Sequence, residues 1–174
     1  GLFQEQGGIA MAAVANRLHQ RMAREHGATL RDQAPVTSVR SVGGEVEVVA
    51  GDVAYRCRQL CVAAGPWSNV VLDMLGLSLP LEVTQEQVTY YATPHLAEFE
   101  PGRFPVWIWM DDPSFYGFPV FGDLTAVKGA EDCGGREVDP DTRTFDPDPD
   151  SLSRLTQFMS RLVGGGFGDP RVTT

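Results

Sequence analysis

A series of short β-type runs, each ending at a turn signal, constrains the fold of this chain more than any other feature. Gly43-Gly44 and Gly51-Asp52 are hairpin-type pairs between three of these runs. Further β-rich runs, several of them aromatic, follow residue 79 and are also separated by turn signals. This pattern predicts a mostly antiparallel sheet in that part. The expected strands are Thr29–Asp32, Val36–Val42, Glu45–Val49, Val53–Cys57, Gln59–Val62, Leu81–Ala92, Val106–Met110, Phe115–Val120 and Leu124–Lys128.

Three stretches have helical periodicity instead. Residues 8–26 carry an apolar stripe at spacings of three to four, and Gly27 follows where a left-handed residue would end the helix. Shorter helices are predicted from about Ser68 to Leu75 and over Leu152–Leu162, the latter stopped by Gly164-Gly165-Gly166. The stripe of the first helix consists of Met11, Val14 or Ala15, Leu18 and Met22.

The sequence pattern changes near residue 78, after which the β-rich aromatic runs begin. Before it, the run Leu60–Ala64 is apolar without alternation, which is typical of a strand buried on both faces, and Pro66 ends it. The sequence thus predicts an α+β chain in two parts, residues 1–78 and 79–174.

Composition excludes several classes of function. The 174 residues carry 23 acidic and 14 basic side chains, a net charge of -9, and no basic stripe that would bind nucleic acid or an anionic membrane. No apolar run approaches the roughly 18 residues that a membrane span needs. Three scattered cysteines favour a reducing compartment, so we expect a soluble cytoplasmic protein. Residues 131–150 alone hold eight acids and two bases, as a Pro-rich surface loop would.

Most catalytic and metal-binding motifs are absent from the sequence. The glycines of 164–168 follow a helix rather than a strand, so they do not form a dinucleotide loop. A calcium loop starting at Asp139 would have Thr144 where a glycine is needed, and no zinc spacing occurs. The stretch Phe104–Lys128 stands out because aromatic strands end near a lone lysine, and these walls suit a small organic ligand. Burial there would lower the pKa of the lysine; the alternative is an aromatic core with a surface lysine.

Short motifs follow one another in a distinctive order along the chain. They are Gly1-Leu2, Gly27-Ala28, Pro35-Val36-Thr37, Val62-Ala63-Ala64-Gly65-Pro66-Trp67-Ser68, Tyr116-Gly117-Phe118-Pro119, Lys128 and Val138-Asp139-Pro140-Asp141-Thr142. Their order and spacing resemble the monomeric sarcosine oxidase and N-methyltryptophan oxidase family, flavin amine oxidases of the D-amino-acid-oxidase-like superfamily. The resemblance covers nearly the whole chain.

The resemblance implies part of a Rossmann-type FAD-binding domain in residues 1–78 and part of a substrate domain, built on an antiparallel sheet, in residues 79–174. Such enzymes oxidise the carbon beside a secondary amine, release an imine that hydrolyses, and pass the electrons to oxygen to give hydrogen peroxide. The family's amino-terminal Gly-x-Gly-x-x-Gly segment and its flavin-linking cysteine have no counterpart here. We therefore expect the chain to be an internal segment of such an enzyme. By itself it should be inactive and should bind FAD weakly. Its exposed apolar surfaces favour self-association.

The resemblance also implies roles for particular residues. Tyr116 matches an active-site tyrosine, Trp107 matches a residue that lines the substrate pocket, and Lys128 matches the lysine that promotes reaction with oxygen. Positions that match contacts to FAD are Val36, Ala63, Ala64, Gly65 and Trp67.

Two departures from the family pattern bear on the identity of the substrate. Aligning Lys128 requires one extra residue after Gly122, and Glu131-Asp132 stand where the family often has a histidine. An acid there would repel a substrate carboxylate, which favours a bulkier or less acidic amine than sarcosine, although Trp107 indicates a small pocket. Two alternatives stay open: a dehydrogenase of the same superfamily that reacts poorly with oxygen, and a non-enzymatic small-ligand or protein-interaction module.

Overall fold

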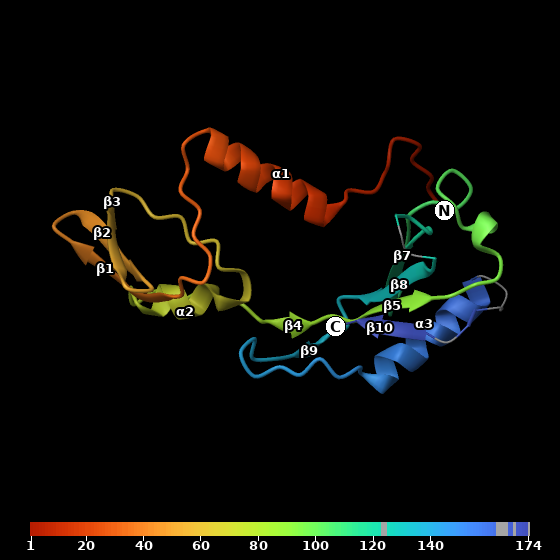
Figure 1. Cartoon of the computed structure of the whole chain (residues 1–174). Helices are drawn as coiled ribbons and strands as arrows, with labels where there is room; N and C mark the ends of the chain where they lie inside the picture. Colours follow the sequence, from red (N-terminus) through yellow and green to blue (C-terminus); the bar gives the residue numbers. More distant parts are fainter. Residues whose placement is uncertain (123–124, 163–166, 169, 174) are drawn as a thin grey trace. The chain divides into compact units, whose positions relative to one another are not determined.

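A computed structural model describes residues 1–122, 125–162, 167–168 and 170–173 of the chain. It divides into two compact units (Figure 1). One unit consists of Ala10–Glu82, and the other consists of Val83–Thr174 together with Gly1–Ile9. Each unit contains its own antiparallel sheet structure, so each is described by itself. No helix in the described part of the chain is both long and apolar enough to cross a membrane.

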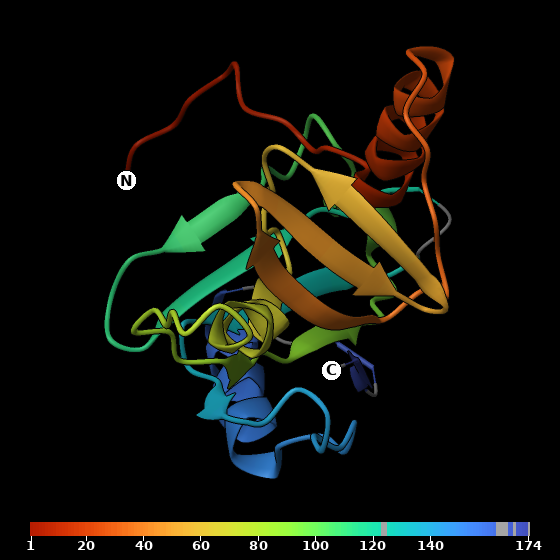
Figure 2. The same ribbon diagram turned by 90° about the vertical axis from the view of Figure 1, so that its left-hand side faces the viewer.

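The sheet of unit Ala10–Glu82 is a meander of β1 (Val36–Val42), β2 (Glu45–Ala50) and β3 (Val53–Cys57), seen face-on in Figure 2. Gly43 and Gly44 have φ values of 60° and 83°, which a two-residue hairpin turn of the primed type requires. The three predicted strands and both predicted hairpins of this region are confirmed.

A carboxylate clamp joins the three strands of this meander. Glu47 on β2 lies directly opposite Arg40 on β1 and Arg56 on β3. Arg40 donates to Glu47 Oε1 from two guanidinium nitrogens, with Nε at 2.8 Å, and Arg56 Nε donates to Oε2 at 3.3 Å. Hydrogen bonds and charge from the two arginines, Arg40 first, lower the pKa of Glu47.

This clamp predicts a pH dependence of stability. Because the folded-state pKa of Glu47 lies below its usual 4.5, its contribution is fully present above pH 4.5 and is lost as the pH falls through the lowered value. Glu47→Gln should therefore lower the urea midpoint at neutral pH, and the gap to the wild type should close under acid conditions. A gap that stays constant with pH would show that the charge of Glu47 is not what stabilises the meander. Glu45→Gln, at an exposed position of the same strand, is the control.

Helix α1 (Ala12–Glu25) begins later than the predicted start at residue 8 but ends as predicted. Gly27 has φ 86°, and the N–H groups of Gly27 and Ala28 donate to the carbonyls of Arg24 and Ala23, both at 2.9 Å. This is a Schellman ending, and it confirms the role assigned to Gly27. The apolar stripe does not reach a core: Met11, Val14, Leu18 and Met22 stay 41–49% exposed.

Two predicted strands of this unit are wrong. Thr29–Asp32 and Gln59–Val62 are irregular, and Leu60 and Cys61 are exposed rather than buried on both faces. A buried strand needs a neighbour on each side, and no described strand pairs with either segment. The short helix predicted near residue 68 is present as α2 (Ser68–Asp73), preceded by the 3-10 turn η1 (Gly65–Trp67).

The second unit is built on a five-stranded antiparallel sheet with the strand order β10-β5-β8-β7-β6. Three of the aromatic runs expected after residue 79 form β5, β6 and β7, as the sequence predicts. The run expected over Leu81–Ala92 is split by Glu86-Gln87 into two strands, and the run expected at Leu124 starts only at Val127. The strands are β4 (Thr84–Gln85), β5 (Val88–Tyr91), β6 (Trp107–Trp109), β7 (Ser114–Phe118), β8 (Val127–Asp132), β9 (Arg136–Glu137), which pairs with β4, and β10 (Pro170–Thr173).

Helix α3 (Pro149–Leu162) covers one face of this sheet and confirms the helix predicted over Leu152–Leu162 (Figure 1). The core between them includes Leu155, Phe158 and Met159 of the helix and Phe115 and Val127 of the strands. Phe158 stacks on Phe115 with ring centroids 4.3 Å apart. The glycines predicted to stop this helix lie outside the described residues.

The start of α3 is fixed by Asp148, at the end of the acidic loop. Its carboxylate accepts hydrogen bonds from the N–H groups of Asp150 at 2.9 Å and Ser151 at 3.3 Å, and Pro149 occupies the first helical position. Both features are typical of a helix N-terminus. The Asp148 N–H donates to the Gln87 side chain at 2.7 Å, which ties the helix start to the segment before β5.

Candidate functional site

The two faces of the five-stranded sheet differ in what covers them. Along β8, an alanine side chain at Gly129 would meet Met159 of α3, and Glu131 binds Arg154 of α3, so the odd-numbered residues of this strand face the helix. The even-numbered residues Lys128 and Ala130 therefore face the other way. We call that side the Lys128 face. Besides these two residues it carries Tyr90 on β5, Ile108 on β6, and Tyr116 and Phe118 on β7.

Lys128 lies among aromatic rings on this face. In the ladder it stands between Phe118 and Tyr90, and its Nζ is 4.5 Å from the ring centroid of Phe118 and 5.4 Å from that of Tyr116. Within the described residues it makes no ion pair and no side-chain hydrogen bond. Burial lowers the pKa of the Lys128 amine, because removal from water disfavours its charged form.

Tyr116 is the second predicted site residue on the Lys128 face. Burial raises the pKa of its hydroxyl, and the negative charges of Asp132 and Glu86 raise it further. Its hydroxyl therefore stays protonated at neutral pH and is available as a hydrogen-bond donor. The structure brings Tyr116 and Lys128 together on this face.

The two acids that follow Lys128 have different surroundings. Glu131 is buried against α3, where Arg154 Nε and Nη2 donate to its two oxygens at 3.0 and 2.7 Å and Ser151 donates at 3.0 Å. Its charge is paired and faces away from Lys128. Asp132 is exposed and lies toward the Tyr116 side, so of these two acids Asp132 is the one that bears on a ligand at the Lys128 face.

Trp107 lies on the opposite face from Lys128 and Tyr116. Its ring covers Gly117, where a Cβ would come within 2.4 Å of it, and lies 5.7 Å from the ring of Phe158. The neighbouring Ile108 stands opposite Tyr116 in the ladder and is 63% exposed. The β6 residue that shares the Lys128 face is thus Ile108, one position from Trp107, the residue that the family resemblance assigns to the substrate pocket.

The positions matched to FAD contacts all belong to the other unit. Val36 begins β1 and is 39% exposed, and Ala63 and Ala64 lead from β3 into η1. Gly65 has φ 54°, and a Cβ added there would meet nothing within 4 Å, so its backbone is open to a ligand. Trp67 is 43% exposed beside it. The Asn69 side chain, which the motif comparison did not single out, exchanges two hydrogen bonds of 2.9 Å with the backbone of Leu79 and fixes the segment after α2.

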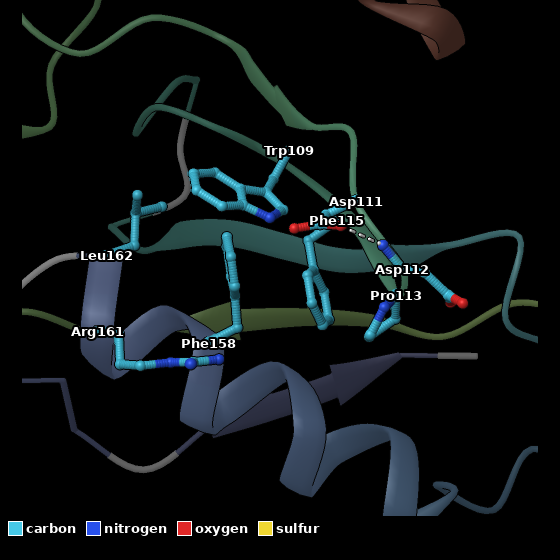
Figure 3. Close-up of a pocket in the computed structure, with 8 residues that line it drawn as sticks. All are labelled: Trp109, Asp111, Asp112, Pro113, Phe115, Phe158, Arg161 and Leu162. Atoms are coloured by element: carbon cyan, nitrogen blue, oxygen red, sulfur yellow. Dashed lines mark hydrogen bonds between the residues drawn. The ribbon is translucent and has the colours of Figure 1, made fainter. Parts of the chain in front are cut away.

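A cavity of about 520 Å³ lies on the α3 side of the sheet, between the ends of β6 and α3 (Figure 3). Phe115 and Phe158 form its inner wall, and Trp109 overhangs them. None of the predicted site residues lines it. Its lining consists of Trp109, Asp111, Asp112, Pro113, Phe115, Phe158, Arg161 and Leu162. In the described part of the chain no cluster of three or more His, Cys, Asp or Glu is arranged to hold a metal ion.

Comparisons with known proteins agree with this architecture. The chain is 34% identical over 179 aligned positions to the peroxisomal sarcosine oxidase of Mus musculus, with 99% of this chain and 45% of the relative covered. It is 23% identical to the monomeric sarcosine oxidase of Bacillus sp. (strain NS-129), with 97% and 44% covered. It is 25% identical to the N-methyl-L-tryptophan oxidase of Citrobacter koseri, with 79% and 36% covered. The chain thus spans less than half the length of these curated relatives.

A solved structure shows the same fold. The open form of NikD, described as an unusual amino acid oxidase essential for nikkomycin biosynthesis, superposes with a TM-score of 0.70 at 27% identity over 88% of this chain and 40% of that one. The α+β fold expected from the sequence is confirmed, and so is the resemblance to sarcosine and N-methyltryptophan oxidases. Residues 1–173 match the family model described as FAD dependent oxidoreductase, and the chain therefore belongs to this DAO family.

Proposed function

We propose that this chain is part of a flavin-dependent amine oxidase that oxidises the C–N bond of a secondary amine or N-methyl amino acid, with oxygen as acceptor and hydrogen peroxide as product. The observation that carries the proposal is the placement of Lys128 and Tyr116 together on one face of the sheet, in a chain of the FAD dependent oxidoreductase family. In this proposal residues 1–78 contribute to binding FAD and residues 79–174 to binding the amine. Three unpaired cysteines fit the cytoplasmic location expected from the sequence.

The residues of the Lys128 face fit a flavin ring. Tyr116, Phe118 and Tyr90 offer aromatic and apolar surface to a flat ring, and Lys128 offers a cation beside them. When bound, FAD supplies the two-electron redox chemistry that no amino-acid side chain provides. On the other unit, the open backbone at Gly65 and the flanking Ala63, Ala64 and Trp67 would contact the cofactor, as would the backbone of Val36.

The roles of the chain's own residues follow from their surroundings. Lys128, whose charge no carboxylate neutralises within the described residues, would stabilise the negative charge that develops on oxygen as it is reduced. Tyr116 would donate a hydrogen bond to the bound amine or its carboxylate. Asp132 disfavours an anionic group at its end of the face, which supports a substrate that is bulkier or less acidic than sarcosine.

A chimera tests the proposal. It carries this chain between the flanking regions of the mouse relative, of which the chain covers 45%. The folded chimera should be yellow and should release peroxide when given N-methyl amino acids or other secondary amines. A chimera that is folded by circular dichroism but colourless would contradict the proposal, and a yellow one that reduces dyes but not oxygen would indicate a dehydrogenase. The 174-residue chain alone should bind FAD weaker than micromolar, which flavin fluorescence measures.

A further inference from the structure

Lys128 is the only lysine in the sequence, because 13 of the 14 basic residues are arginines. Arginine stays protonated in proteins, so Lys128 carries the only side-chain amine that can lose its proton and act as a nucleophile. In the 174-residue protein used below, the other primary amine is the α-amino group of Gly1. The chain therefore presents a single reactive side-chain amine, and the fold places it on the face described above.

We propose that the Lys128 amine is a covalent capture site for small aldehydes, which it binds as a Schiff base. The neutral amine adds to the carbonyl carbon to give a carbinolamine, whose hydroxyl leaves as water when the C=N bond forms. The reaction consumes one aldehyde and releases one water, with no oxidant or reductant. Aldehydes are also the products expected when the imine of an oxidised N-alkyl amine hydrolyses. The capture itself needs only the free amine, so it does not depend on the proposed oxidation.

The surroundings of the amine favour this chemistry in two ways. First, Phe118 and Tyr116 border it on one side and Tyr90 stands next to it on β5, so the amine sits against apolar walls that a small organic carbonyl can also contact. Second, no carboxylate of the described residues forms an ion pair that would hold the ammonium form. Asp132 lies on the same face four residues along β8, opposite Ser114 rather than Phe118.

Burial lowers the pKa of Lys128, in agreement with this geometry. A lowered pKa leaves a larger fraction of Lys128 as the neutral amine at neutral pH, which is partly offset by a weaker nucleophile. The alkylation rate of Lys128 is therefore best compared with that of an exposed lysine. Arg17, exposed on α1, is a suitable place for it. The double variant Lys128→Arg/Arg17→Lys moves the only lysine to the surface without a change in net charge.

The experiment measures how fast acetaldehyde and cyanoborohydride alkylate the single lysine of each folded 174-residue protein at neutral pH, by mass spectrometry of the lysine-containing peptide. Wild-type Lys128 should react roughly three- to tenfold faster than the lysine of the double variant. In concentrated urea the two rates should become equal. Equal or slower alkylation of Lys128 in the folded protein would overturn the proposal. So would an advantage that persists in urea, because the fold would then not be its cause.

The same proposal can be checked without the double variant. Wild-type Lys128 should lose its fast alkylation when urea unfolds the chain, whereas the rate at the Gly1 amine should change little, since Gly1 is exposed in the folded protein. A Lys128 rate that stays the same or rises on unfolding would show that the fold shields the amine rather than activates it.

Discussion

Lys128→Met in the FAD-loaded chimera is expected to slow reoxidation of the reduced flavin by oxygen by about 10²-fold or more, the usual loss when a preorganised charge-stabilising group is removed. Reduction of the flavin by the amine should change by only a few-fold, because oxygen is not reduced in that half-reaction. Stopped-flow absorbance measures the two half-reactions separately. Methionine is close in length to lysine and apolar, so it keeps contact with Phe118 while removing the charge.

Lys128→Arg is the matched control for this prediction. It retains the positive charge beside Phe118 and Tyr116, so reoxidation should be slowed much less than in Lys128→Met. Equal slowing of both half-reactions in Lys128→Met would instead show that the side chain shapes the substrate pocket and has no specific role with oxygen.

Phe158→Ala is expected to cause the largest loss of stability of any single change in the α3 core, about 3–4 kcal/mol. Phe158 is 7% exposed and contacts the rings of Phe115, Trp107 and Trp109, with centroids 4.3, 5.7 and 5.6 Å away. Truncation leaves a cavity under both tryptophans, so near-ultraviolet circular dichroism should weaken along with the urea midpoint.

Phe3→Ala is the control for this substitution, because Phe3 is 75% exposed and its truncation should leave the midpoint within about 0.5 kcal/mol of wild type. If Phe158→Ala were as mild as Phe3→Ala, α3 would not be what stabilises this sheet.

Local patterns were sufficient to predict much of the fold. The turn at Gly43-Gly44 and the helix end at Gly27 each depend on residues within a few positions, and both agree with the structure. The buried strand predicted at Leu60 is wrong, because such a strand requires paired neighbours that are distant in sequence. The same holds for the stripe on α1, whose apolar side chains remain exposed although their spacing is helical.

The candidate site depended still more on long-range pairing. Period-two alternation would have placed Phe118 with Tyr116, but only the register of β6 against β7 shows that Ile108 rather than Trp107 shares their face. The pairing of Glu131 with Arg154 is likewise not visible in the sequence, since 23 residues separate them. What the family resemblance contributed was the joint importance of Tyr116 and Lys128, which the strand register then brings onto one face.

A crystal structure of the FAD-loaded chimera is the sharpest test of whether flavin chemistry takes place on the Lys128 face of the sheet. We expect the flavin ring to contact Lys128 Nζ and to lie on the same side of the sheet as Tyr116 and Ile108. A flavin ring on the α3 side, in the cavity beside Trp109 and Arg161, or one remote from Lys128, would contradict it.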